Sequence, residues 1–162
     1  MGREIERRFL VTGDGWRPGA VATRLRQGYL STDPRRIVRV RLVAGTAGEQ
    51  ATLTIKGHSA GAGPAAAERP EYEYPLPPAD ARELLDLCEQ PLLEKTRHRV
   101  AYAGRTWEVD EFHGRNQGLV IAECELAAVD DPLEVPAWAG REVTGDPRYA
   151  NSSLVARPFS DW

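Results

Sequence analysis

Residues 4–11 of this 162-residue chain read Glu4-Ile5-Glu6-Arg7-Arg8-Phe9-Leu10-Val11, a pattern typical of a β-strand with charges on one face. Successive side chains of an extended chain point to opposite faces, so Glu4, Glu6 and Arg8 share a face. An unpaired charge is costly to bury. That face therefore either meets solvent or lines a polar cavity that holds an ionic ligand.

The same spacing recurs in other segments that are predicted as strands. The charged pairs, with one lysine that ends a strand-like run, are Arg39 and Arg41, Lys56, Glu71 and Glu73, Lys95 and Arg97, Glu108 and Asp110, and Glu123 and Glu125. Chance alone gives roughly 3–4 acidic pairs of this spacing, so their number carries little weight. Their location inside predicted strands is the informative feature. A solvated outer face of a sheet is the plainer interpretation of any single pair.

The composition is that of a globular protein, with 41% hydrophobic and 28% charged residues. At this length we expect a single domain over residues 1–162. The net charge of −3 argues against a nucleic-acid partner, which normally requires a basic excess. No apolar run is long enough to span a membrane, so no membrane partner is expected. The absence of a secretory signal, and two cysteines (Cys88 and Cys124) without metal-site spacing, predict buried thiols in a cytoplasmic protein.

Eight strands are predicted, separated by turns rich in Gly, Pro and Asp. They span residues 3–11, 24–30, 37–44, 50–57, 69–76, 93–103, 105–112 and 118–128. An amphipathic helix is predicted over 79–89, with shorter helical stretches near 136–140 and over 146–154, and a flexible loop over 57–68. The predicted fold class is α+β, mostly β: an eight-stranded antiparallel closed barrel with a few outer helices. If the charges point inward, the barrel is a polar tunnel and the helices cover its apolar outer face.

Both kinds of charge suit one class of ligand. Paired carboxylates are hard oxygen ligands suited to Mg²⁺ or Mn²⁺. Paired bases suit phosphate oxygens, which a planar guanidinium can meet with two parallel hydrogen bonds. A ligand that needs several bases and a divalent cation together is a polyphosphate, and a metal-activated water could attack its terminal phosphorus in line. The pattern therefore indicates a small anionic substrate and a Mg²⁺ or Mn²⁺ cofactor.

The stretch over residues 4–11 resembles the E-x-E-x-K signature of the CYTH superfamily, the triphosphate tunnel metalloenzymes. Further motifs resemble that family in the same order along the chain. They are Arg26-Gln27-Gly28-Tyr29-Leu30, Val38-Arg39-Val40-Arg41, Leu53-Thr54-Ile55-Lys56-Gly57, Glu71-Tyr72-Glu73-Tyr74, Glu94-Lys95-Thr96-Arg97, Trp107-Glu108-Val109-Asp110-Glu111-Phe112 and Ala122-Glu123-Cys124-Glu125-Leu126. Together they cover about residues 3–126, and residues 145–152 are similar to the short bacterial single-domain members. One such motif is weak evidence of a resemblance, but a whole series in the same order is strong evidence.

The resemblance implies an eight-stranded antiparallel tunnel that binds a triphosphate with a divalent metal and hydrolyses it. By position, it implies a catalytic signature and three groups of binding residues. These are Glu4, Glu6 and Arg8 for catalysis; Glu4, Glu6, Glu123 and Glu125 for metal, with Glu108 and Asp110 as further candidates; Arg39, Arg41, Lys56, Lys95 and Arg97 for phosphates; and Glu71 and Glu73 for the acidic half of the substrate site.

One position departs from the signature, because Arg8 stands where the family has lysine. Arginine keeps the positive charge but stays protonated at any working pH, so it cannot act as a general base. If the lysine of the family abstracts a proton, activity here would be impaired. If it stabilises charge or positions water, activity would persist.

Several functions remain open at this point. The first hypothesis is a metal-dependent triphosphatase that acts on inorganic tripolyphosphate or on nucleoside triphosphates. Adenylate cyclase or thiamine triphosphatase activity is an alternative within the family, and the departure at Arg8 motivates a non-catalytic polyphosphate- or nucleotide-binding module. A purely structural barrel with internally paired charges is the blandest alternative. A homodimer is left open, because no surface patch in the sequence argues for one.

Overall fold

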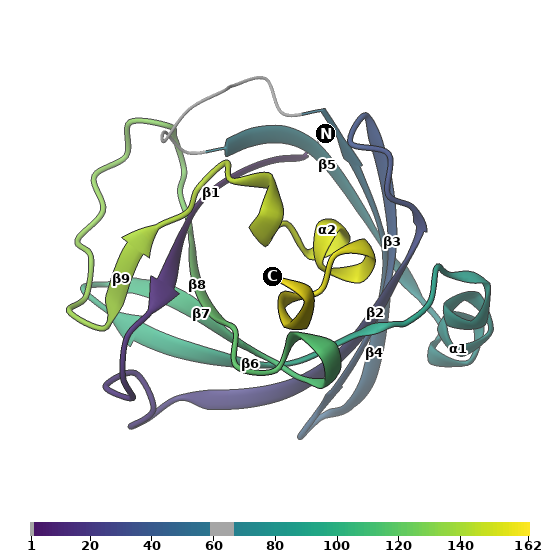
Figure 1. Ribbon diagram of the computed structural model, residues 1–162, viewed down its shortest axis with the longest axis horizontal. Helices are drawn as coiled ribbons and strands as arrows, with labels where there is room; N and C mark the ends of the chain where they lie inside the picture. Colours follow the sequence, from purple (N-terminus) through teal and green to yellow (C-terminus); the bar gives the residue numbers. More distant parts are fainter. Residues whose placement is uncertain (1, 59–66) are drawn as a thin grey trace.

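The computed structural model describes residues 2–58 and 67–162, and these form one antiparallel sheet that closes into a barrel (Figure 1). The eight barrel strands agree closely with the predicted ones. They are β1 (Gly2–Val11), β2 (Val21–Ser31), β3 (Arg36–Gly45), β4 (Gly48–Gly57), β5 (Ala67–Leu76), β6 (Leu93–Tyr102), β7 (Arg105–Phe112) and β8 (Val120–Glu125). A short ninth strand, β9 (Ala139–Glu142), is added to β1. The predicted eight-stranded closed barrel is confirmed.

Strand β1 closes the ring. The strand order is β5-β4-β3-β2-β6-β7-β8-β1, and β1 pairs with β5 as well as with β8. Its first residues, from Gly2 to Glu6, lie opposite β5, while Glu6 to Leu10 lie opposite β8. The stretch that carries the charged signature is therefore held on both sides by backbone hydrogen bonds.

The apolar outer face of the barrel is covered in two places. Helix α1 (Pro78–Leu87), close to its predicted range, packs Ala81 and Leu85 against Val40 and Leu42 of β3. Elsewhere the cover is not helical, because Trp16 and the segment before β9 pack over β1, β7 and β8. Cys88 and Cys124 are both buried and unpaired, as predicted.

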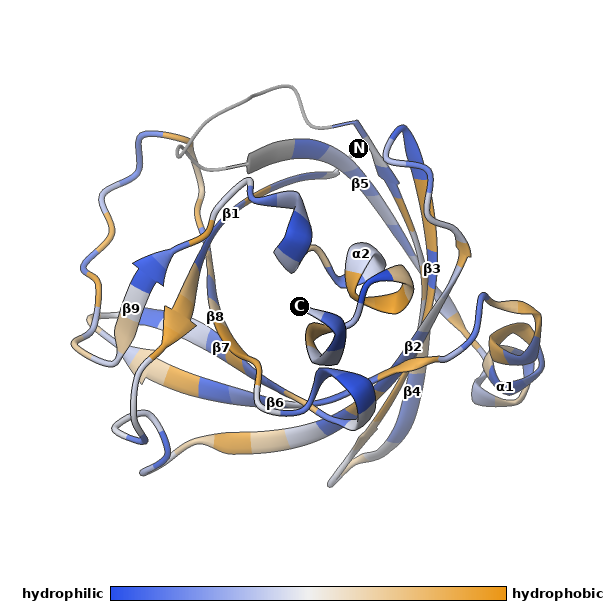
Figure 2. Cartoon of the chain, in the orientation of Figure 1, coloured by the Kyte–Doolittle hydropathy of each residue, from blue (hydrophilic) through white to orange (hydrophobic). Residues whose placement is uncertain are grey.

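The end of the chain lies inside the barrel rather than outside it, as Figure 1 shows for α2 (Asn151–Ala156) and the C-terminus. Leu154 and Val155 of α2 pack against Tyr29, Leu93 and Phe112. The expectation of a few helices packed outside the barrel holds for α1, but α2 lies inside. The physical reason is that an eight-stranded barrel encloses a space that side chains must fill. Hydrophilic and hydrophobic residues alternate along the strands in Figure 2.

The 3-10 helices η1 (Gly114–Asn116), η2 (Pro147–Tyr149) and η3 (Phe159–Asp161) complete the fold. The helix predicted over 146–154 is split into η2 and α2, because Ala150 between them has an extended backbone. The helical stretch predicted near 136–140 is wrong, since Ala139 and Gly140 enter β9. A side chain at position 140 would meet the Leu10 carbonyl oxygen at 3.2 Å, so glycine allows β9 to approach β1.

Two remaining expectations are only partly tested. Of the loop predicted over 57–68, residues 59–66 lie outside the described residues, while residues 67 and 68 begin β5. In the part of the chain that the structure describes, no helix is both long and apolar enough to cross a lipid bilayer.

Gly28 lies where the end of α1 meets β2, and the packing leaves no room for a side chain there. A Cβ atom at this position would lie 2.6 Å from Cys88 Cβ and 2.8 Å from Leu92 Cδ2. Gly28→Ala should therefore lower the free energy of unfolding by about 1–3 kcal/mol, the usual cost of overpacking. Gly45→Ala is the matched control, because its nearest neighbour, Thr23 Cγ2, is 3.4 Å away. Urea unfolding compares the two, and equal losses would contradict the packing argument.

The ion pair between Arg7 of β1 and Glu142 of β9 should make stability depend on pH. Two hydrogen bonds of 2.8 and 2.7 Å from Arg7 lower the pKa of the Glu142 carboxyl below its ordinary value of 4.5. The stabilisation is present above that ordinary value and is lost as the pH falls through the lowered pKa. Glu142→Gln should cost up to about 1 kcal/mol at pH 7, because the pair is partly exposed, and less at pH 3. Guanidinium unfolding at both pH values measures the difference, and a cost that grows in acid refutes it.

Candidate active site in the barrel interior

The charged pairs predicted from the strand pattern line the inner face of the barrel. Some ion pairs join strands that are not neighbours in the ring, such as Lys56 of β4 with Glu4 of β1 at 2.7 Å. Such contacts require the concave face. Lys95 and Asp110 are completely buried, and Arg39 is 7% exposed. These side chains therefore line an enclosed polar interior, and the solvated outer face is excluded for them.

Arg8 lies at the centre of the first charged group. Its guanidinium lies 2.9 Å from Glu6 Oε1 and 3.4 Å from Glu123 Oε1. Another of its nitrogens donates a 3.1 Å hydrogen bond to the backbone carbonyl oxygen of Tyr149. Arg8 thus ties two carboxylates of the predicted metal set to the C-terminal segment inside the barrel.

The two carboxyl groups beside Arg8 have different acidities. Burial, with the nearby charge of Glu123, raises the pKa of Glu6 to about 7, although Arg8 opposes the change. Burial also acts on Glu123, but Arg8 and Arg97 together outweigh it and lower its pKa. Glu6 has one guanidinium partner while Glu123 has two, which explains the difference. An additional cation beside Glu6 would relieve the repulsion between the two carboxylates.

The second charged group surrounds Glu4. Both carboxylate oxygens of Glu4 accept from Lys56 Nζ, at 2.9 and 2.7 Å, and one of them also accepts from Arg69 Nε at 3.0 Å. Burial alone would raise the pKa of Glu4, but Lys56 and Arg69 outweigh burial and lower that pKa. Lys56 also lies 3.2 Å from Glu71. Lys56 is therefore shared between two carboxylates rather than free for phosphate.

The third charged group is the most deeply buried. Asp110 accepts from Lys95 Nζ at 2.6 Å and from Arg97 at 2.7 and 2.8 Å, so both of its oxygens are occupied. Arg97 also reaches Glu108 at 2.8 Å. Burial lowers the pKa of Lys95 to about 7, even though Asp110 opposes the change. The carboxylate of Asp110 is thus shared between two bases that the family resemblance assigned to phosphate binding.

Arg39 and Arg41 differ from the other interior bases. The guanidinium of Arg39 is 3.7 Å from Glu73, and its Nε is buried with no hydrogen-bond partner among the described residues. Arg41 donates to the side-chain amide of Gln27 at 3.0 Å. Burial, with the neighbouring charges of Arg39 and Arg97, lowers the pKa of Arg41 to about 9. This part of the interior therefore has positive charge that carboxylates only partly balance, which suits an anion.

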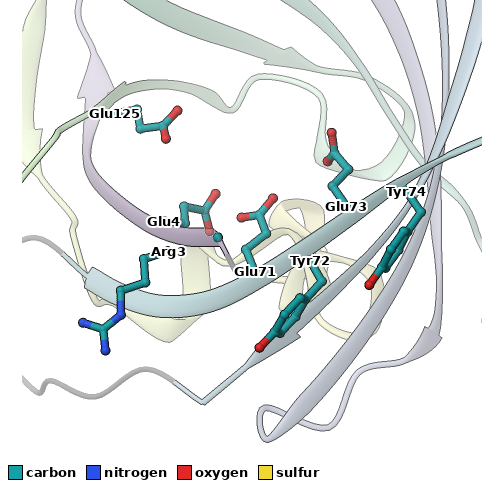
Figure 3. A pocket seen from close by; sticks show the side chains of 8 residues that line it. Arg3, Glu4, Glu71, Tyr72, Glu73, Tyr74 and Glu125 are labelled. Atoms are coloured by element: carbon teal, nitrogen blue, oxygen red, sulfur yellow. The ribbon is translucent and has the colours of Figure 1, made fainter.

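An acidic pocket of about 520 Å³ opens beside β1 and β5. Figure 3 shows Glu71 and Glu73 pointing to one side of β5, where Glu4 and Glu125 also lie, while the tyrosines of β5 point to the other side. Glu125 is exposed and is paired in register with Glu6. The carboxylates of Glu4, Glu71, Glu73 and Glu125 thus form the rim of the charged interior.

Several interior residues were missed by the sequence analysis. Gln27, Tyr29, Thr54, Arg69 and Asn151 all make hydrogen bonds or ion pairs with the predicted residues or with one another. Gln27, Tyr29 and Thr54 lie at inward positions of their strands but carry no charge, so a search for charged pairs passes over them. Strand parity alone could have found these three. Nothing in the local pattern places Asn151, because α2 reaches the interior only through the fold.

The predicted metal ligands are not gathered around a common point. Across residues 2–58 and 67–162, no three Asp, Glu, His or Cys side chains are arranged to hold a metal ion. Lys56, Arg8 and Arg97 hold the carboxylates instead. The donor set still suits a hard divalent cation, since it consists of carboxylate oxygens, and the pair of Glu6 and Glu123 is incompletely neutralised.

Comparison with known proteins agrees with this geometry. An inorganic triphosphatase of Acetivibrio thermocellus is 47% identical over all of this chain and 99% of its own length. A crystal structure of an inorganic triphosphatase is 33% identical, with a TM-score of 0.63 over 96% of this chain and 95% of that one.

A more distant structure shares the fold alone. It is a protein from Hippeastrum that was proposed to be an adenylyl cyclase and reveals a dominant triphosphatase activity. It is 14% identical, with a TM-score of 0.61 over 77% of this chain and 80% of that one. The family model described as the CYTH domain matches residues 2–159. With its closed barrel and charged interior, this chain belongs to the CYTH domain family.

Proposed function

We propose that this protein hydrolyses a triphosphate inside its barrel, with inorganic tripolyphosphate as the substrate. The observation that carries the proposal is the pair Arg39 and Arg41, which are neighbouring inward side chains of β3, buried and part-buried respectively, and incompletely neutralised. A compact polyanion supplies the missing negative charge. The names of two relatives that match nearly the full chain, both inorganic triphosphatases, support the same substrate.

We further propose that a divalent metal, Mg²⁺ or Mn²⁺, takes part. The family is metal-dependent in general, and the interior supplies carboxylate oxygens of the kind these ions prefer. Glu4, Glu6, Glu123 and Glu125 would hold the ion, with Glu108 and Asp110 farther along the same wall. When bound, such an ion neutralises phosphoryl charge and makes water more acidic.

The side chains of the barrel would divide the remaining work. Arg39 and Arg41 bind the phosphoryl oxygens directly, because they are the bases least neutralised by the protein. Lys56, Lys95 and Arg97 share their charge with carboxylates, so they contribute to phosphate binding mainly by orienting the acidic groups and by their long-range field. Glu71 and Glu73 form the acidic rim beside them. The substrate is held away from bulk water, where these charges act strongly.

Arg8 would act through its charge and not as a base. The guanidinium remains protonated, and the neighbouring Glu6 and Glu123 raise its pKa further, after burial has opposed them. Its contacts place it between the predicted metal ligands and Tyr149. In this position it fixes two carboxylates and contributes positive charge beside the phosphates.

Other functions receive less support. Adenylate cyclase activity requires a site for adenine and ribose, and thiamine triphosphatase activity requires a site for thiamine, whereas the described interior is lined mainly by charges. A non-catalytic binding module is the second candidate, favoured only by Arg8 in place of lysine. We also propose a cytoplasmic location, supported by the two unpaired buried thiols.

Purified protein with Mg²⁺ or Mn²⁺ should release phosphate from tripolyphosphate, and ATP should yield no cyclic AMP. Arg41→Gln should raise the KM for tripolyphosphate by about tenfold or more, because one part-buried positive charge that no carboxylate of the described residues pairs is lost. Arg26→Gln is the matched control, since Arg26 lies on the outer face beside Glu94 and is half-exposed. Phosphate release over a range of substrate concentrations measures both variants. Equal effects of the two substitutions would count against the proposed anion site.

If Arg8 acts by charge, the rate of phosphate release by Arg8→Lys should stay within about threefold of the wild-type rate. The rate for Arg8→Met should fall about a hundredfold or more below it. Lysine keeps the charge near Glu6 but cannot also reach the Tyr149 carbonyl oxygen with a second nitrogen. Single-turnover rates with tripolyphosphate distinguish the variants. A gain above about tenfold in Arg8→Lys would instead favour a crippled site and the non-catalytic module.

A further inference from the structure

The interior bases fall into two sets according to their nearest partners. Arg8, Lys56, Lys95 and Arg97 each have a carboxylate oxygen between 2.6 and 2.9 Å away. Their charges are balanced within the protein. The second set consists of Arg39 and Arg41, whose closest side-chain partners are neutral.

The neutral partner of Arg41 is Gln27, which is completely buried. Gln27 Oε1 accepts from Arg41 Nε at 3.0 Å, and Gln27 Nε2 donates to Tyr29 Oη at 3.0 Å. The same Nε2 is 3.5 Å from Asn151 Oδ1, which also accepts from Lys95 Nζ at 2.9 Å. Among the residues that the structure describes, no acid lies within ion-pair distance of Arg41. The amide of Gln27 is therefore held in one orientation by groups on both sides.

The neutral partner of Arg39 is Thr54, which is also completely buried. Thr54 Oγ1 accepts from the Arg39 guanidinium at 3.0 Å and donates to Glu73 Oε2 at 3.0 Å. The hydroxyl thus stands between the arginine and the carboxylate, which remain 3.7 Å apart. It satisfies hydrogen bonds of both groups without adding a charge.

A neutral partner has a different electrostatic consequence from a carboxylate. An amide or hydroxyl oxygen satisfies a buried N–H group and fixes the guanidinium, but it leaves the net charge in place. A carboxylate would cancel that charge and would have to be displaced before an anion could bind. Because burial strengthens every remaining interaction, the uncancelled charge acts strongly on a ligand.

We propose that Gln27 and Thr54 are positioning residues that keep the charge of Arg41 unpaired and that of Arg39 only partly compensated, and so determine that the interior accepts a highly charged anion. The inference rests on the proposed function for the identity of that anion, inorganic tripolyphosphate. It goes further by assigning the selectivity to two uncharged side chains that contact the arginines rather than the substrate.

The test is a comparison of Gln27→Glu with Gln27→Met, using inorganic tripolyphosphate in EDTA and isothermal titration calorimetry. Glutamate keeps the shape of glutamine and pairs with Arg41, so tripolyphosphate affinity should fall about tenfold or more below that of Gln27→Met. Thermal unfolding without ligand should show the opposite order, with Gln27→Glu the more stable of the two. Merely structural damage would move affinity and stability in the same direction.

A second pair of variants tests the same point at Arg39. Thr54→Asp and Thr54→Asn differ only in charge, so Thr54→Asp should bind tripolyphosphate about tenfold more weakly. If Gln27→Glu fails to fold, the comparison of Thr54→Asp with Thr54→Asn alone tests the inference. Affinities that agree within about threefold in each foldable pair, or tighter binding by the acidic variant, would overturn the inference.

The outcomes separate this inference from the proposed function. Wild-type protein that binds tripolyphosphate but releases no phosphate would refute hydrolysis, while the binding comparison would still decide the roles of Gln27 and Thr54. Hydrolysis by the wild type, with equal affinities in each pair of variants, would refute the inference alone. A wild type that does not bind tripolyphosphate in EDTA would refute the inference, and one that also releases no phosphate with Mg²⁺ or Mn²⁺ would refute both.

Discussion

A charge that is removed from water must be met by an opposite charge or by well-placed hydrogen bonds, and this requirement governs the barrel interior. Lys95 and Asp110, both completely buried, lie 2.6 Å apart, and Arg97 occupies the remaining oxygen of that carboxylate. Most interior charges are balanced in this manner. The few that are not, at Arg39 and Arg41, determine where the barrel can hold an anion.

The architecture sets up this balance through strand geometry. On the inner face of β1, the side chains pass from Glu4 and Glu6 through Arg8 to Leu10, which packs against the apolar cluster around α2. Charged and apolar layers are therefore stacked along the barrel, while the outer face is covered by α1 and by tryptophan-containing segments. The C-terminal segment fills the apolar layer and supplies Asn151 and the Tyr149 carbonyl oxygen to the charged one.

Strand alternation was enough to predict the eight strands and which charges share a face, because both follow from local spacing. It left open whether the face of residues such as Glu6, Arg41 and Lys95 points inward, and the family resemblance favoured the interior. The partner of each charge was not predictable. Arg8 meets Glu123 only because β1 pairs with β8 in a particular register, and Asp110 meets Lys95 across β6 and β7. The position of α2 also depends on packing between distant segments, so its local pattern gave the helix but not its place. Neutral residues such as Gln27 escaped notice because their role arises from what surrounds them.

The double pairing of β1 has a consequence for biosynthesis. The pairing of β1 with β8 brings Glu6 opposite Glu125, positions separated by about 120 residues. The barrel therefore cannot close until nearly all of its strands have left the ribosome. At roughly 5–20 residues per second, this delay is roughly 6–24 s. During that interval the nascent chain has open strand edges, which are prone to pair with other chains. The barrel is therefore most exposed to edge-to-edge pairing before β8 is synthesised.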